Sequence, residues 1–285
     1  MADTKSTAST KANPAEGAKQ SGNMISLLAP VICVIVGYII WRFVLGNPSG
    51  FSKPGTGAFW PDHDGPKNAL NKMYLGGIIV PILIGSFLTM LTFVIERFMT
   101  ISKATGNGSS ADFLRKVQYH LANKNVDAAI AECDKQRGSV GNVMKSGLHK
   151  YKEMIGNTEL STEQKVLAIQ KQVEEATSLE LPMLEKNLVF LSTIASVATL
   201  LGLLGTVLGM IRSFSALGEG EGGGDAASKL SVGISEALYN TALGIGTSAF
   251  AIIFYNMFTT KIDAITYGID ESGFTLTQSF ASQYR

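Results

Sequence analysis

Glu236 is the residue with the clearest chemical potential, because it lies in a long apolar stretch near the C-terminus. It is the only charged residue between Lys229 and Lys261. A carboxylate at bilayer depth costs about 3 kcal/mol on insertion scales, so it must face protein or water, or be protonated. An ionisable residue in such a place indicates a path for protons or ions. The alternative is that the helix starts deep and Glu236 lies among the lipid headgroups.

Polar and small residues recur at helical spacing around Glu236 and in the apolar stretch before it. Small and hydroxyl residues are also ordinary contacts between packed membrane helices, so packing alone explains any single Ser or Thr. Two facing polar stripes with an ionisable residue favour a proton or ion pathway. The stripes consist of Glu236, Asn240, Gly244 and Thr247, with Thr241 beside them, and of Ser192, Ser196, Thr199 and Thr206 in the earlier stretch.

Composition indicates a membrane protein and excludes several functions. Charged residues make up 16% of the 285 residues, against roughly 25% in an average soluble chain. A formal net charge of +1 argues against a nucleic-acid partner. The two cysteines and three histidines are far apart, without metal-ligand or nucleophile–base spacing. We therefore expect no enzyme activity, no metal and no cofactor.

Four long apolar stretches predict an all-α membrane protein with about four transmembrane helices, since about 20 apolar residues span the hydrocarbon core. Two long helices should project from the membrane into a helical domain. The expected order is a disordered tail (1–23), a first transmembrane helix (24–45), a loop (46–72), a second transmembrane helix (73–97), a helical domain (98–186), a third transmembrane helix (187–212), a loop (213–230), a fourth transmembrane helix (231–258) and a tail (259–285).

The stretch 24–45 has a rival interpretation as a cleaved signal peptide. Its apolar run is longer than a signal peptide needs and no small-residue cleavage motif follows, which favours a retained helix. The loop after it contains Asp62, His63 and Asp64, which could be imagined as metal ligands but fit a solvated turn better. Phe59, Trp60 and Tyr74 are typical of an aromatic belt at the membrane interface.

The segment 98–186 has a soluble, helical character, with amphipathic helices expected over 109–124 and 125–138. A capping pattern starts a further helix at Ser161. We expect Pro182 to bend this helix without ending it, so that it continues to about residue 213. Its length would be roughly 80 Å, of which only ~30 Å fits in lipid.

Basic residues flank the predicted helical domain and predict the orientation. Arg97, Lys103, Lys171 and Lys186 lie beside the second and third spans, and the positive-inside rule places residues 98–186 in the cytoplasm. Both tails then lie in the cytoplasm, and the loops 46–72 and 213–230 lie on the periplasmic side.

Two motifs carry a family resemblance. GLLGTVLGMIR at 202–212 and EALYNTALGIG at 236–246 together resemble the paired motifs of the ExbB/TolQ/MotA proton-channel family. The likeness extends from about residue 73 to 260. Glu236 matches the family's functional glutamate, and Thr206 and Thr241 match its two threonines. Glu236 and Thr241 lie five residues apart, about 140° around a helix, so the role of Thr241 rests on the resemblance alone.

The resemblance implies a multi-pass protein of the bacterial inner membrane that forms a ring, usually a homopentamer. The ring would surround an ExbD-like partner (ExbD, TolR or MotB), a single-span protein with a membrane aspartate. Proton flow through the pair would use the proton motive force to energise a TonB-like protein and transport across the outer membrane. Asn240, Thr199 and Ser196 are further candidates for the pathway.

Some features depart from the family pattern. ExbB and TolQ usually have three spans, and this chain adds residues 24–45. MotA has four spans, but its members generally lack the glutamate and the Gly-Thr pair, so Glu236 and Thr206 favour the ExbB/TolQ branch. Asn240 stands where a small residue is expected. The alternatives are a TolQ-like, gliding or secretion motor subunit, a non-conducting membrane scaffold, and a transporter, for which no inverted repeat is visible.

Overall fold

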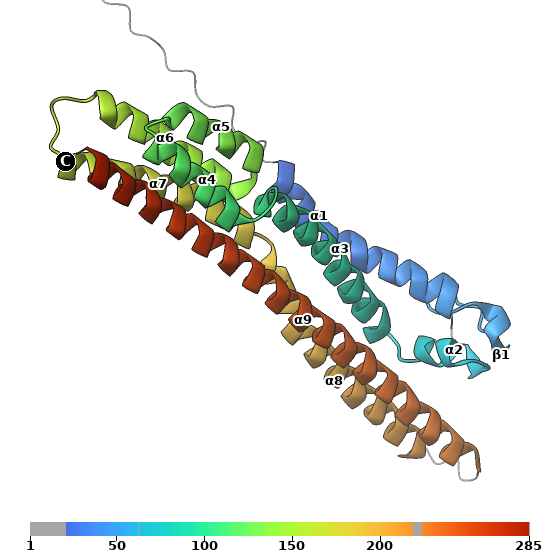
Figure 1. The fold of residues 1–285 in the computed structure, drawn as a ribbon. Helices are drawn as coiled ribbons and strands as arrows, with labels where there is room; N and C mark the ends of the chain where they lie inside the picture. The colour runs from blue at the N-terminus through green and yellow to red at the C-terminus, as the bar shows by residue number, and fades with distance from the viewer. Residues whose placement is uncertain (1–20, 62, 219–223, 285) are drawn as a thin grey trace, which may run out of the picture.

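The computed structural model describes residues 21–61, 63–218 and 224–284, and its fold is long and mostly helical (Figure 1). Helices α8 (Leu188–Gly218) and α9 (Gly224–Gln283) form an extended antiparallel pair along the molecule. Helices α1 (Ser21–Ile40) and α3 (Ile79–Thr105) pack beside each other and join this pair. Four helices are long and apolar enough to cross a membrane, with apolar windows in α1, α3, α8 and α9.

A bundle rich in charged residues occupies the end of the molecule where the chain terminates (Figure 1). It contains α4 (Ser110–Ala122), α5 (Val126–Gln136), α6 (Gly138–Gly156) and α7 (Thr162–Glu185), together with the second half of α9; we call this the polar bundle. The capping pattern predicted at Ser161 is present, because its side chain and that of Gln164 each accept a bond from the other's backbone N–H.

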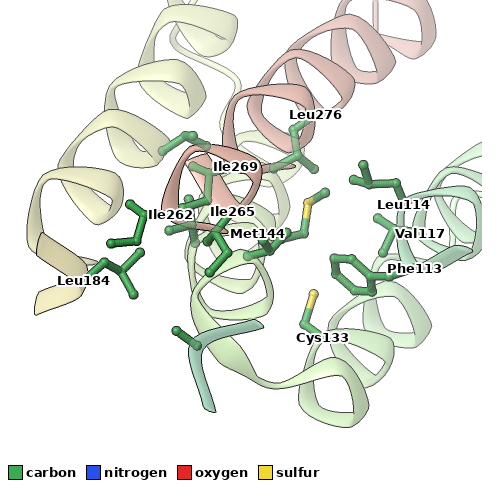
Figure 2. Close-up of a cluster of buried hydrophobic side chains, with 14 of the residues drawn as sticks. Phe113, Leu114, Val117, Cys133, Met144, Leu184, Ile262, Ile265, Ile269 and Leu276 are labelled. Carbon is green, nitrogen blue, oxygen red and sulfur yellow. The ribbon is translucent and has the colours of Figure 1, made fainter. Parts of the chain in front are cut away.

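A single apolar core holds the polar bundle together (Figure 2). Apolar side chains of α4, α6 and α9 point inward from three directions. Elsewhere in this core the rings of Tyr151 and Phe280 meet edge to face at 4.9 Å. Side chains buried in this way stabilise a bundle through the apolar area that they remove from water. The most deeply buried members include Val117, Met144, Leu148, Ile269, Leu276 and Phe280.

The residues that the sequence assigned to a C-terminal tail belong to this core. Helix α9 continues through 60 residues without a break, and Ile262, Ile265 and Ile269 face the polar bundle. Their spacing of three and four residues is that of one helix face. The segment 259–283 is therefore a packed helix.

The long helix expected from residue 161 to about 213 is interrupted after Glu185, so its expected continuity is wrong. Pro182 lies inside α7 and does not itself end the helix. Helix α7 ends at Glu185, and Asn187 takes a left-handed conformation with φ of 67° before α8 begins. Asn tolerates this conformation better than most residues. Its side-chain amide also donates to Glu96 Oε2 at 3.2 Å, so a contact with α3 fixes the break.

The loop predicted between the first two spans is partly ordered, and residues 46–77 are called the hairpin segment here. It contains a two-stranded antiparallel sheet, β1 (Phe51–Lys53) and β2 (Asp64–Pro66), followed by α2 (Ala69–Tyr74). The strands are the one departure from an all-α fold among the described residues. Gly77, with φ of 75°, separates α2 from α3, so the second span starts as a helix only at Ile79.

An aromatic cluster fastens the hairpin segment to the end of α1. Trp41 stacks on Tyr74 at 4.3 Å and lies at the same distance from Trp60. Tyr74 is 3% exposed and belongs to the buried part of this aromatic cluster. Phe59 and Trp60 are exposed, as residues of an aromatic belt at the membrane interface are expected to be.

Candidate functional site

The α8–α9 pair is held by close contact between small residues. A Cβ placed on Gly244 would lie 2.5 Å from the carbonyl oxygen of Ala198, and one on Gly202 would lie 3.1 Å from that of Asn240. A Cβ placed on Gly209 would lie 2.8 Å from the Cβ of Ala237. Only glycine leaves room for two backbones to approach so closely. Membrane helices commonly pack in this way, because in lipid the hydrophobic effect does not drive helices together and close contact does. This line of contact is called the glycine seam here.

Two threonines meet across the glycine seam. The hydroxyls of Thr206 and Thr241 are hydrogen-bonded to each other, and both are within reach of the Gly202 carbonyl, at 3.3 and 3.1 Å. Because a hydroxyl can donate and accept at once, the pair can carry a polar chain through an apolar interface. The structure thus brings together two residues that the sequence connects only through a resemblance.

Asn240 is buried at the point where α9 crosses the beginning of α3. Its amide nitrogen donates to the Gly76 carbonyl at 3.1 Å, and Oδ1 has no hydrogen-bond partner among the described residues. Gly205 makes the room that the amide needs, since a Cβ there would lie 2.6 Å from that of Asn240. Asn240 thus fits where a small residue was expected because its neighbour on α8 is a glycine.

Glu236 lies one helical turn before Asn240 and is half-buried. It lines a cavity of 130 Å³ with Ser231 and Ser235 of its own helix and with Lys72 and Pro66 of the hairpin segment. The positive charge of Arg212, at the end of α8, also acts on this carboxylate. The site therefore combines one carboxylate with two cations from different elements.

The candidate residues divide into two groups in space. Thr206, Thr241 and Asn240 lie in or beside the glycine seam, and Glu236 lies at the cavity, next in sequence to the seam residue Ala237. Ser196 is exposed and bonds within α8 to the Ser192 carbonyl, and neither Ser196 nor Thr199 bonds to a described residue of α9. Glycines, together with Thr206, make the face of α8 that meets α9, and most of the predicted hydroxyl stripe points elsewhere.

The metal interpretation of the first loop finds little support in the described residues. His63 Nδ1 accepts a bond from the Gly55 N–H at 2.9 Å and the ring stacks on Phe51, while Asp62 lies outside the described residues. In the part of the chain that the structure describes, no group of three or more acidic, histidine or cysteine side chains could hold a metal ion.

The two cations near Glu236, Lys72 and Arg212, were not among the residues predicted for the site. Lys72 was assigned to a loop. Its position at the same cavity as Glu236 leaves no local pattern in the sequence, because the two residues are far apart along the chain. Arg212 offered a signal, because it directly follows the uncharged stretch 187–211 and so marks the end of that span. A membrane helix ending in Arg, opposite a helix that carries a carboxylate, is a pairing that sequence alone can suggest.

Comparison with known proteins agrees with these features. Residues 135–271 match the model of the MotA/TolQ/ExbB proton channel family. A putative ExbB-like biopolymer transport protein of Synechocystis is 43% identical over 86 residues, 30% of this chain and 41% of that protein. The Tol-Pal system protein TolQ of Haemophilus influenzae is 39% identical over 101 residues, 34% of this chain and 43% of its own.

The biopolymer transport protein ExbB of Helicobacter pylori is 42% identical over 83 residues, which cover 29% of this chain and 56% of that protein. In these three relatives the matched part is about half of their own length or less. The family match includes Thr206, Glu236, Asn240 and Thr241 and excludes α1 and the hairpin segment. Over residues 135–271 this membrane protein therefore resembles the MotA/TolQ/ExbB proton channel family.

Proposed function

We propose that this protein is an ion-conducting subunit of ExbB or TolQ type, which uses the proton motive force to drive movement in an associated protein. The observation that carries the proposal is Glu236, a carboxylate half-buried at a cavity that Lys72 also lines and adjacent in sequence to the seam residue Ala237. A carboxylate there can take up and release a proton, and the Thr206–Thr241 pair continues the polar path into the helix pair.

The energy available suits such a role. One elementary charge crossing 100 mV releases about 2.3 kcal/mol, enough for a modest conformational step per proton. The relative named as the biopolymer transport protein ExbB supports a transport role. Following the family resemblance, we infer that this role is energised transport across the outer membrane through a TonB-like protein, with an ExbD-like single-span partner. The relatives named TolQ support a Tol-Pal role as the second candidate. In both cases the protein would lie in the inner membrane with residues 98–186 in the cytoplasm.

The exposed apolar surface supports assembly into a homo-oligomer, which the family resemblance suggests is a pentamer. Large apolar side chains point outward on the polar bundle as well as on the predicted spans; Leu167, Leu179 and Tyr267 are 64%, 76% and 71% exposed. Apolar patches that lipid does not cover usually contact another protein. Native mass spectrometry in mild detergent should show a closed ring, and a stable monomer would contradict this part of the proposal.

The decisive experiment compares Glu236→Gln with Glu236→Asp. Growth is measured in cells that depend on the system, and proton flux is measured in vesicles that also contain the partner. Gln keeps size and hydrogen bonding but cannot ionise, so it should assemble normally and abolish flux and energised growth. Asp should retain part of both. The matched control is Glu159→Gln, which changes an exposed glutamate between α6 and α7.

If Glu236→Gln supports wild-type flux at equal membrane levels, Glu236 is a packing residue and the scaffold alternative replaces the channel. The orientation is tested separately by cysteine labelling from either side of the membrane. We expect positions in 50–65 to react from outside and positions in 140–160 only from inside.

A further inference from the structure

The cavity at Glu236 has a wall that the family match does not include. One side comes from α9 itself, through Ser231 and Ser235, and the other comes from Pro66, Lys72 and Leu75 of the hairpin segment. The family match begins at residue 135, so this second wall comes from residues outside the match. Lys72 is the charged residue of that second wall.

The position of Lys72 is fixed by its neighbours along α2. Asn71 donates from its buried amide to the Leu45 carbonyl at 2.9 Å, and the Trp41 indole donates to the Tyr74 carbonyl at 3.1 Å. Both partners lie in the π-helical turn Trp41–Leu45 that ends the first apolar helix. The same aromatic cluster packs against Leu243 of α9. The first helix therefore holds α2 in place against α9.

The charges around the cavity are arranged as one anion between two cations. Lys72 of α2 and Glu236 line the same cavity, and Arg212 at the end of α8 lies close enough for its charge to act on the Glu236 carboxylate. No described ion pair joins Lys72 and Glu236 directly, so their charges act across the cavity. The interaction between charges is stronger in a partly buried site than in bulk water, so Lys72 should affect the carboxylate without touching it.

The cavity is also suitable for water. Its 130 Å³ exceed the space that one water molecule needs, and serine hydroxyls, an ammonium group and a carboxylate offer hydrogen bonds around it. Water held between Lys72 and Glu236 would connect the carboxylate with the solvent on that side of the protein. The hairpin segment would then control how protons reach Glu236.

We propose that Lys72 is a positioning residue for proton transfer at Glu236, brought there by the first helix and the hairpin segment. The inference rests on the proposed function and deepens it. It assigns to the additional span a specific task, which is to hold one charged wall of the entry cavity. Lys72 acts through Glu236 and through the water between them.

The first test measures proton flux in vesicles with the partner present, for Lys72→Met, Lys72→Arg and the control Lys67→Met. Lys67 lies in the same segment, bonds through Nζ to the Ser49 carbonyl and does not line the cavity. Lys72→Met should lower flux about tenfold, which corresponds to about 1.4 kcal/mol. Lys72→Arg should restore it, and Lys67→Met should leave it unchanged. Normal flux in Lys72→Met overturns the inference, and so does a failure of Arg to rescue.

The second test separates this inference from the proposed function. Thermal unfolding in detergent is measured for Lys72→Met, alone and combined with Glu236→Gln, which makes a double-mutant cycle. Lys72→Met should lower Tm by about 2–4 °C in the parent and have no effect in the Glu236→Gln background, where no carboxylate remains. Equal shifts in both backgrounds overturn the coupling of Lys72 to Glu236. Normal flux in Glu236→Gln overturns the proposed function instead.

Discussion

The polar bundle and the glycine seam solve the same packing problem in opposite ways. In the polar bundle, large aliphatic and aromatic side chains fill a core, and Leu148 and Phe280 are completely buried. At the glycine seam, Gly202, Gly209 and Gly244 let the two backbones approach closely. Water drives the burial of apolar side chains, but lipid is as apolar as they are, so helices in a membrane gain from close contact and hydrogen bonds instead.

This difference predicts which substitutions each region tolerates. The core of the polar bundle should be most sensitive to loss of volume, because a cavity remains where a side chain was. The glycine seam should be most sensitive to added volume, because a backbone atom cannot move aside as a side chain can. The boundary between the regions, at the α7–α8 break, should respond to the loss of buried hydrogen bonds.

The largest effect is expected from Phe280→Ala in the polar bundle. Removing a fully buried ring should lower the free energy of unfolding by about 3–5 kcal/mol. The matched control is Phe274→Ala in the same helix, because Phe274 is 68% exposed. The measurement is denaturant unfolding in detergent, followed by tryptophan fluorescence and circular dichroism. Similar losses for both variants would mean that the C-terminal part of α9 is not packed as described.

The glycine seam is tested by Gly244→Ala against Gly246→Ala. A methyl on Gly244 would lie 2.5 Å from a backbone oxygen, whereas one on Gly246 meets nothing within 4 Å. We expect Gly244→Ala to destabilise the protein by about 1–3 kcal/mol through overpacking. Gly246→Ala should be neutral or slightly stabilising, because Ala favours a helix more than Gly does. Equal results would contradict close backbone contact at the seam.

A third prediction concerns Arg97, which lies buried where α3 meets the α7–α8 break. Its guanidinium pairs with Glu96 and donates to the carbonyls of Met183 and Leu184 at 3.2 and 3.1 Å. Arg97→Met would leave these acceptors without a donor, at a cost of about 1–3 kcal/mol. Limited proteolysis should then cut near residue 186. The control is Arg115→Met, since Arg115 is 75% exposed, and equal proteolysis of both would disprove the role of Arg97.

The smallest effect is a chemical one at Cys133, which lies in the core shown in Figure 2. Burial raises the pKa of its thiol from 9.0 to about 12. The thiol therefore stays neutral in the folded protein while it ionises in the unfolded chain, so stability should fall as pH rises from about 9 to 12.

Alkylation of Cys133 measures this effect, in a Cys33→Ser background that leaves one thiol. Iodoacetamide at pH 8 should react slowly with the native protein and fast after unfolding in SDS, because the thiolate is the nucleophile. Phe280→Ala should accelerate the native reaction, and Gly244→Ala should not, if the two regions open independently. Fast labelling of the folded parent protein would contradict the burial of Cys133.

Much of the architecture follows from local patterns in the sequence. Residues 187–211 carry no charge and are long enough to cross a bilayer, so hydropathy alone identifies them. The helix start at Ser161 needs only its own first turn, through Gln164. Glu236 stands out because it is one charge among uncharged residues. The spacing of Ile262, Ile265 and Ile269 also held a helical signal, although the segment was assigned to a tail.

Other features depend on contacts between segments distant in the sequence, and only the tertiary structure decides them. Glu96 and Asn187 meet across 91 positions and fix the break that Pro182 alone does not explain. Asn240 bonds to Gly76 across 164 positions, and Lys72 joins Glu236 at one cavity over a similar distance. Hydropathy and helix period report what a segment buries, but they carry no information about which distant residue it meets. The sequence by itself thus determined the spans and the carboxylate, while folding selected the charges and backbone groups around it.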